Sequence, residues 1–395
     1  MSLVPFQELS QRIQKLQRGM SAQGIDGALI VQRADLFYFS GTGQDAHLFV
    51  PVAGEPILVV RKSLERVMED SPFRAYPSKR PSDIKALLGD RMRSSSFRTL
   101  GMELDVLPVN SFRWYQELFP ETMIVDVSPL IREIRMIKSA YELELIKQAG
   151  QLNDEMFAYA AQTLREGMTE LELSAILECW YRKRGHPGLV RVRNFNQEVV
   201  YGHIMSGPNL ALPSATVGPT GGRGPHPSLP HGASDRIIGR HEPVQIDYVA
   251  VFQGYIVDQA RTFFLGEPPQ KFRDIHALAL EIQNTLAAHG KPDSPCEALY
   301  ETALRIVKDA GLTRGFMGWP QPVSFVGHGV GLELDEFPVV GRKSPHRFQE
   351  GMVVALEPKF ILPGEGLAGI ENTFVVTDRG LKKITQFDDE IQVLP

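Results

Sequence analysis

The sequence predicts an α+β protein of two domains, in which a smaller α/β domain over residues 1–130 precedes a larger domain over residues 131–395. The chain has 395 residues, which is more than one ordinary hydrophobic core supports. Short apolar runs and helical patterns alternate along the first 130 residues, as in an α/β domain. After them the order changes to helices followed by strands and long loops.

The elements of the first domain follow from these patterns. A helix begins the chain, because apolar residues recur at helical spacing from Leu9 to Met20 and Gly24 follows. Ser82 is a suitable N-cap for a helix that reaches Leu88, and a further helix is predicted over residues 108–118. The predicted strands are residues 28–31, 47–52, 57–60, 99–104 and 123–127.

The second domain is predicted to open with two helices. The segment SPLIREIRMIKSAYELE is interpreted as a linker that leads into the first helix, where Ser139 and Glu142 form a capping box. Thr169 and Glu172 begin the second helix in the same way. The later predicted elements are helices around residues 271–288 and 295–310 and strands near residues 353–357 and 370–376.

Residues 205–235 form a long segment rich in Pro and Gly, with almost no periodicity. A loop of this length inside a compact domain is usually functional or disordered. The segment therefore marks either part of a binding site or a disordered stretch.

Composition excludes several classes of protein. The net charge of −5 and the pI near 6.1 argue against a nucleic-acid-binding surface, which needs a basic excess. The two cysteines do not form a Cys-x-x-Cys pair, so a thiolate zinc site is excluded and a reducing compartment is favoured. The N-terminal residues lack the apolar region of a signal peptide, and no apolar run approaches the length of a membrane span. We therefore expect a cytoplasmic protein without membrane or nucleic-acid partners.

Two aspartates, Asp247 and Asp258, lie in the paired apolar stretches of VQIDYVAVFQGYIVDQARTFF. If the turn is centred between Phe252 and Gln253, the aspartates are directly opposite, with Cβ atoms about 5 Å apart. That spacing suits a pair of metal ions about 3.5–4 Å apart. A turn centred on Gln253-Gly254 is chemically at least as plausible and needs a one-residue bulge to keep this pairing. The alternative interpretation is two acids on a solvated strand face.

Three further residues complete a candidate metal site. His328 lies between two glycines in FVGHGVGLELDEFP, Glu357 ends a strand in MVVALEPKF, and Glu371 lies in AGIENTFVV. By itself His328 is equally well explained as a buried histidine with satisfied hydrogen bonds. Four ionised carboxylates carry a charge of −4, which two divalent ions cancel. Oxygen-rich ligation with one imidazole favours Mn, Co, Fe or Zn over Mg alone.

The order Asp-x10-Asp, Gly-His-Gly-x-Gly, Glu-Pro and Ile-Glu-Asn resembles the methionine aminopeptidase, prolidase and aminopeptidase P family. LFYFSG and IREIRMIKSAYELELIKQAG resemble the branch that contains Xaa-Pro dipeptidases and aminopeptidase P, so the likeness covers most of the chain. The resemblance implies a C-terminal pita-bread domain, a smaller N-terminal domain that helps to shape the substrate site, and a homodimer. It also implies two metal ions, with manganese the first choice, on the five residues named above.

The function implied by this resemblance is hydrolysis of the N-terminal amide bond of short peptides, with Xaa-Pro peptides the expected substrates. A hydroxide that bridges two divalent ions would attack the carbonyl carbon, because metal ions strongly lower the pKa of bound water. By resemblance, Glu357 would carry the proton to the leaving nitrogen.

Two positions depart from the family pattern. Where family peptidases usually carry a histidine seven residues after the histidine ligand, this chain has Asp335. An ionised aspartate cannot donate a hydrogen bond to an oxyanion, so Asp335 either binds a cationic group of the substrate or is a surface acid. Where proline-specific members carry an arginine two residues before the last glutamate, this chain has Gly369, which weakens a strict dipeptidase assignment.

The loop GPNLALPSATVGPTGGRGPHPSLPHGASDR is the third departure. Family members often have a shorter Asn-x-x-x-Pro-His stretch, whose histidine contacts the substrate amide. His231 is the better match and is predicted to be catalytic, while His226 is a rival for substrate binding. A loop histidine without a role is the simplest alternative.

Two other functions compete with the exopeptidase. The first is a hydrolase of a non-peptide amide or related C–N bond on the same scaffold, which Asp335, Gly369 and the unusual loop favour. The second is a catalytically silent binding module, against which the complete set of candidate ligands argues.

Overall fold

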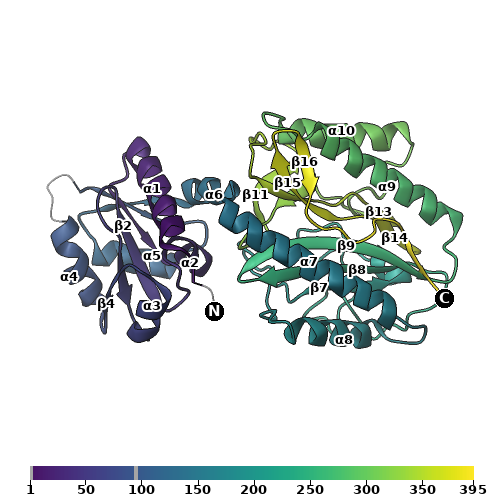
Figure 1. Cartoon of the computed structure of the whole chain (residues 1–395), viewed down its shortest axis with the longest axis horizontal. Coiled ribbons are helices and arrows are strands. Elements are labelled where there is room, and N and C mark those ends of the chain that lie inside the picture. Colours follow the sequence, from purple (N-terminus) through teal and green to yellow (C-terminus); the bar gives the residue numbers. More distant parts are fainter. Residues whose placement is uncertain (1–2, 93–96) are drawn as a thin grey trace. The chain divides into compact units, whose positions relative to one another are not determined.

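A computed structural model describes residues 3–92 and 97–395, and the chain divides into an N-terminal unit, residues 1–135, and a C-terminal unit, residues 136–395 (Figure 1). Each unit has its own helices and its own hydrophobic core, and no sheet is shared between the units in the described part of the chain.

The N-terminal unit is built on one six-stranded sheet in the order β4-β3-β2-β1-β5-β6. The pairs β3–β4, β1–β5 and β5–β6 are parallel, and β1–β2 and β2–β3 are antiparallel. Its strands are β1 (Gly27–Ile30), β2 (Ala46–Pro51), β3 (Ile57–Val60), β4 (Arg74–Pro77), β5 (Thr99–Met102) and β6 (Met123–Asp126). Its helices are α1 (Phe6–Gln23), α2 (Arg33–Ser40), α3 (Leu64–Asp70), α4 (Pro81–Met92), α5 (Val109–Leu118) and α6 (Ser128–Met136). Every predicted strand of this domain is part of the sheet.

Two helices of this unit, α2 and α6, are not among the elements predicted from the sequence. The LFYFSG stretch lies in α2, which begins where the Gln32 side chain accepts a hydrogen bond from the Asp35 backbone N–H and ends at Gly41 in the left-handed region. The predicted linker is wrong for its first half, because residues 128–136 form the helix α6. Its last turn is held by a buried ion pair of 2.5 Å between Arg135 and Asp35.

The C-terminal unit contains a four-stranded sheet, β17-β9-β8-β7, a five-stranded sheet, β11-β10-β12-β15-β16, and the pair β13–β14. The strands of the first sheet are β7 (Gly202–Ser206), β8 (Val244–Phe252), β9 (Tyr255–Leu265) and β17 (Gln392–Leu394). Those of the second are β10 (Phe325–Gly329), β11 (Glu336–Gly341), β12 (Val353–Leu356), β15 (Asn372–Thr377) and β16 (Gly380–Lys383), and the pair is β13 (Lys359–Leu362) and β14 (Gly366–Gly369).

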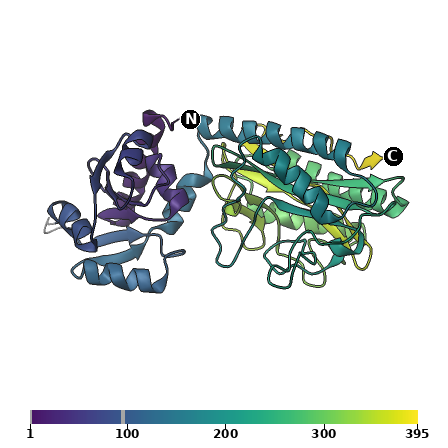
Figure 2. The ribbon, with the colours of Figure 1, turned by 90° about the horizontal axis from the view of Figure 1, so that it is seen from below.

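Helices cover the sheets of this unit from two sides (Figures 1 and 2). On one side α7 (Ala140–Thr163) packs on β8 and β9, and α8 (Glu170–Arg182) packs on β7. On the other side α9 (Gln270–His289) contacts β14 and β16, and α10 (Cys296–Asp309) contacts β11. Both predicted capping boxes, at Ser139 and Thr169, are present.

The two larger sheets meet where β9 lies beside the start of β15. A bridge pairs Ala260 with Glu371, and the Thr373 hydroxyl bonds to the backbone of Asp258. The polar residues that the sequence singles out lie at this junction.

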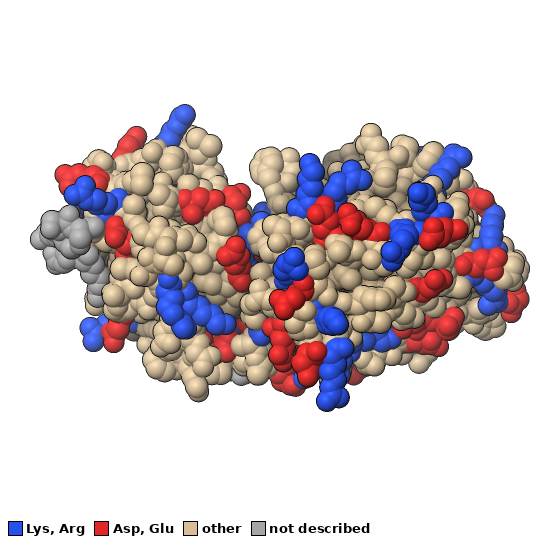
Figure 3. Space-filling view, turned by 90° about the horizontal axis from the view of Figure 1, so that it is seen from above, with Lys and Arg blue, Asp and Glu red and all other residues tan. Residues whose placement is uncertain are grey.

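On the described surface seen in Figure 3, Lys and Arg side chains are interspersed with Asp and Glu. This mixture agrees with the small net charge of −5. Of the helices in the described part of the chain, none combines the length and the apolar character needed to cross a bilayer.

Candidate metal centre

Asp247 and Asp258 lie on the β8–β9 hairpin, and both are buried. The loop consists of Gln253 and Gly254, both with positive φ, as type I′ hairpin turns require. The register continues without a bulge and pairs Asp258 with Val249, two residues beyond Asp247. The turn is therefore the one centred on Gln253-Gly254, and the directly opposite pairing, which needed the other turn or a bulge, is wrong. They are diagonal neighbours on the same face of the hairpin, which still places both carboxylates on one side.

His328 lies in β10, between two glycines at which the chain passes close to its neighbours. A Cβ at Gly327 would lie 2.4 Å from the Ala355 carbonyl oxygen, and one at Gly329 would lie 2.2 Å from that of Phe337. The His328 Nδ1 lies 3.2 Å from the Gly329 carbonyl oxygen, to which it donates. In the neutral ring this bond fixes the proton on Nδ1, so Nε2 carries a lone pair that can bind a cation.

Glu357 directly follows β12, and Glu371 directly precedes β15. Their residues are 4% and 1% exposed, so both carboxylates are withdrawn from water. Burial of an ionised carboxylate is costly unless a cation or hydrogen-bond donors compensate its charge.

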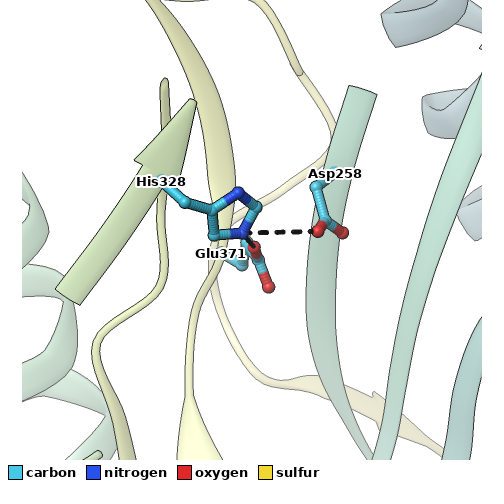
Figure 4. A group of neighbouring side chains, drawn as sticks. All are labelled: Asp258, His328 and Glu371. Atoms are coloured by element: carbon cyan, nitrogen blue, oxygen red, sulfur yellow. Dashed lines mark ion pairs between the residues drawn. The ribbon is translucent and has the colours of Figure 1, made fainter. Parts of the chain in front are cut away.

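These residues converge on His328. Its Nε2 lies 3.8 Å from Asp258 Oδ2 and 3.9 Å from Glu371 Oε1 (Figure 4). The same Nε2 lies 3.7 Å from Glu357 Oε1. One ligand atom each from Asp258, His328 and Glu371 fits within a span of 4.8 Å. Among the described residues, Asp258 Oδ1 and Glu371 Oε1 are buried without a hydrogen-bond partner. Electron-pair donors gathered in this way fit a divalent cation.

A residue that the sequence analysis missed, Lys359, also reaches the cluster. Its Nζ donates to Asp247 Oδ2 at 2.7 Å, Glu357 Oε2 at 2.9 Å and Glu371 Oε2 at 2.7 Å. The only sequence signal was its position directly after Glu-Pro at the start of β13.

Electrostatics reflect this crowding of charge. Burial and the neighbouring Asp247 raise the pKa of Asp258 to about 7, and burial with the charge of Asp258 raises that of Glu371 well above its ordinary value. Burial acts to raise the pKa of Asp247, but the Lys359 ammonium, with the other neighbouring groups, outweighs burial, and the pKa of this carboxyl lies below its ordinary value. The carboxyls of Asp258 and Glu371 therefore give up their protons less readily than ordinary carboxyls, whereas that of Asp247 does so more readily.

The two candidate loop histidines have different surroundings. His226 is exposed, with its Nδ1 2.9 Å from the Ser228 hydroxyl. His231 is partly buried, and its Nε2 lies 3.0 Å from Nε2 of His203 on β7. His203 pairs with Asp247 across β7–β8. His231 thus approaches the cluster through a histidine that the sequence analysis missed.

Burial dominates the titration of this histidine pair. It lowers the pKa of His231 to about 3 and also lowers the pKa of His203. Both rings are therefore neutral near pH 7, and one donates its Nε2–H to the other.

Asp335 anchors a loop. Its carboxylate accepts hydrogen bonds from the backbone N–H groups of Arg193 at 2.7 Å and Asn194 at 2.9 Å. Neither sequence interpretation of Asp335, as a substrate ligand or as a surface acid, included these bonds.

The loop of residues 205–235 is held by Glu170 at the start of α8. This buried carboxylate accepts hydrogen bonds from Ser206, Asn209 and Ser234, at distances of 2.6–2.9 Å. A 3-10 helix, η1 (Gly207–Ala211), follows β7. The beginning and the end of the loop are thereby fixed to one side chain.

A buried cluster of four carboxylates and one imidazole, set between two sheets, defines the class of metal-dependent hydrolases. The chain belongs to metallopeptidase family M24, whose sequence model matches residues 144–378, more than half of the chain. Residues 12–137 match the creatinase/prolidase N-terminal domain. These matches confirm the resemblance and the predicted pita-bread fold class.

Known relatives cover the chain almost completely. The Xaa-Pro dipeptidase of Pyrococcus furiosus is 28% identical over 388 residues, which are 97% of this chain and 100% of the relative. The prolidase structure from Pyrococcus horikoshii is 26% identical, with a TM-score of 0.80 over 96% of this chain and 99% of that one. The X-Pro aminopeptidase structure from Thermotoga maritima, at 24% identity and a TM-score of 0.80 over 95% of this chain and 100% of that one, shows the same fold.

Proposed function

We propose that this protein is a metal-dependent exopeptidase that hydrolyses the N-terminal amide bond of short peptides, with Xaa-Pro peptides as its substrates. The observation that carries the proposal is the convergence of Asp258, Glu357 and Glu371 on the Nε2 lone pair of His328. The Xaa-Pro dipeptidases and prolidases among its relatives support the choice of substrate.

The ligand chemistry favours manganese, with cobalt, zinc or iron as alternatives. Asp258, His328, Glu357 and Glu371 would hold the metal, with Asp247 beside them. When bound, a divalent ion supplies a Lewis acid for the amide carbonyl and lowers the pKa of water. The homodimer and the cytoplasmic location expected from the sequence belong to this proposal; size-exclusion chromatography with light scattering and cell fractionation test them.

The protein's own groups have separate roles in this reaction. Glu357 would accept a proton and return it to the leaving nitrogen, since its Oε1 lies 3.7 Å from His328 Nε2, beside which the metal would bind. His231 would donate a hydrogen bond to the substrate carbonyl. Its contact with His203, which pairs with Asp247 across β7–β8, supports this role.

The test is a substrate panel with manganese-loaded protein. It compares Xaa-Pro dipeptides and longer Xaa-Pro peptides with N-acyl amino acids and cyclic amides. We expect turnover of the Xaa-Pro peptides, its loss in Asp258→Asn, and its retention in the control Asp378→Asn, whose side chain is 74% exposed. Turnover of only the non-peptide amides would favour the second hydrolase, and bound metal without turnover of any substrate would favour a silent binding module.

A further inference from the structure

Lys359 divides the carboxylate cluster into two halves. Its side chain is only 2% exposed, and its ammonium has one acceptor for each of its three N–H groups, on Asp247, Glu357 and Glu371. A fully coordinated ammonium of this kind is a fixed part of the site.

The other half of the cluster, near His328, holds the oxygens that Lys359 does not use. Glu357 and Glu371 each give Oε2 to Lys359 and turn Oε1 toward His328 Nε2, at 3.7 and 3.9 Å. In a two-metal site, bridging carboxylates give one oxygen to each ion, and the ions lie about 3.5–4 Å apart. Here the Lys359 ammonium is hydrogen-bonded to Oε2 of Glu357 and Glu371, the oxygens that a second ion would bind.

The strand opposite Lys359 provides the space for this side chain. Gly369 pairs with Lys359 across β13–β14, and a Cβ at Gly369 would lie 2.8 Å from Lys359 Cα and 2.9 Å from its Cγ. The nearest atom to this Cβ would be the Pro358 carbonyl oxygen at 2.7 Å, so a larger residue would collide with the backbone of the opposite strand as well as with the Lys359 side chain. The close approach of the two strands therefore requires glycine at position 369, whose missing side chain also leaves room for the Lys359 Cγ.

Charge leads to the same conclusion. The four ionised carboxylates contribute a charge of −4 and Lys359 a charge of +1, so one divalent ion brings the net charge of the site to −1. A second divalent ion would have to share three carboxylates with an ammonium already bonded to them, and the two cations would repel each other.

We propose that the centre binds one divalent ion, on Asp258, His328, Glu357 and Glu371, and that the Lys359 ammonium takes the place of the second ion. Asp247 is then a partner of Lys359, and Lys359 is a positioning residue that orients three carboxylates. This inference revises the predicted number of ions and rests on the proposed function only in requiring that the centre bind metal.

The first test needs no variant. Full-length protein is saturated with Mn²⁺, freed of excess, and measured by elemental analysis and electron paramagnetic resonance. We expect one ion per chain and the six-line spectrum of an isolated Mn²⁺. Two ions per chain with an exchange-coupled spectrum would overturn the inference and leave the exopeptidase proposal standing, whereas no bound ion would overturn both.

The second test removes the ammonium. Lys359→Ala is expected to bind two ions per chain and to show the exchange-coupled spectrum, while Lys382→Ala, at an exposed position of β16, keeps one. One ion per chain in a folded Lys359→Ala protein would show that the lysine does not exclude a second ion and would overturn the inference. Lys359→Ser serves the same purpose if the alanine variant does not fold, and the measurement on the unaltered protein decides if neither does.

Discussion

The hydroxyl of Thr373 satisfies both backbone groups of Asp258: it accepts from the N–H at 3.1 Å and donates to the carbonyl at 2.7 Å. Asp258 belongs to one sheet and Thr373 to the other, two residues after Glu371. A single side chain thus sets the spacing between two candidate ligands from separate sheets.

Replacing this hydroxyl is expected to weaken both the fold and metal binding. Thr373→Val keeps the shape but leaves two buried backbone groups of Asp258 unsatisfied, which should lower the free energy of unfolding by about 2 kcal/mol. Thr373→Ser retains the hydroxyl and should lose only about 1 kcal/mol. Urea unfolding and Mn²⁺ titration measure the two effects, and equal metal affinity in all three proteins would contradict a spacing role.

Removing the negative charge of Asp258 should have opposite effects on the stability of the fold with and without bound metal. Asp258→Asn relieves repulsion among buried carboxylates, so the metal-free variant should be more stable than the metal-free parent at pH 8, on the order of 2 kcal/mol. With saturating Mn²⁺ the order should reverse, because only the parent gains the free energy of binding, about 3 kcal/mol at a hundredfold excess over Kd.

Calorimetric melting of both proteins, with chelator and with Mn²⁺, checks this reversal. The exposed variant Asp378→Asn serves as control and should melt like the parent in both conditions. A metal-free Asp258→Asn protein that melts below its parent would mean that the charge of Asp258 is compensated without metal.

The four candidate acids could be selected from the sequence because each lies within or directly beside an apolar strand, where an isolated acid is costly. Asp258 and Glu371 stand between buried residues, and the glycines beside His328 signalled close backbone approach. The turn of the hairpin could not be fixed, since Phe252-Gln253 and Gln253-Gly254 differ by a shift that only the three-dimensional register resolves.

Partners contributed from elsewhere in the fold could not be predicted. Lys359 resembles an ordinary strand lysine in the sequence, and only the fold brings its ammonium to carboxylates from β8 and from the residues beside β12 and β15. Glu170 lies between the two residues of a predicted capping box, and nothing in the sequence indicates that its carboxylate holds a loop through contacts 36 to 64 residues apart. Such contacts depend on the tertiary structure and leave no local pattern.

Glu170→Gln is expected to loosen the loop of residues 205–235. In the variant, the NH2 group of the new glutamine side chain would face N–H and O–H donors that are now bonded to a carboxylate oxygen of Glu170. The loss of these hydrogen bonds should lower the free energy of unfolding by about 2 kcal/mol. Hydrogen exchange should accelerate at the amides of Ser206 and Ser234, which now donate to Glu170. Glu172→Gln, in the same helical turn, preserves a capping box and should exchange like the parent; equal protection in both variants would show that Glu170 does not anchor the loop.

His186 should make the C-terminal unit sensitive to acid. The residue is 1% exposed, its Nε2–H donates to the Val249 carbonyl at 3.1 Å, and its Nδ1 accepts from the Gly188 N–H at 3.0 Å. Burial is the main cause that lowers its pKa from 6.5 to about 4. A proton on Nδ1 would also remove the acceptor for Gly188.

Since the folded-state pKa lies below the unfolded one, the stabilisation is complete above pH 6.5 and is lost as the pH falls toward 4. The loss amounts to about 3 kcal/mol, from a shift of roughly two and a half units. His186→Phe should be less stable than the parent at pH 7.5 but lose less stability between pH 6.5 and 4. Tyr201→Phe, which keeps the ring stacked on His186 at 4.4 Å, should change stability equally at both pH values. Urea unfolding across this range decides: parallel pH profiles for the parent and His186→Phe would exclude His186 as the source of the acid sensitivity.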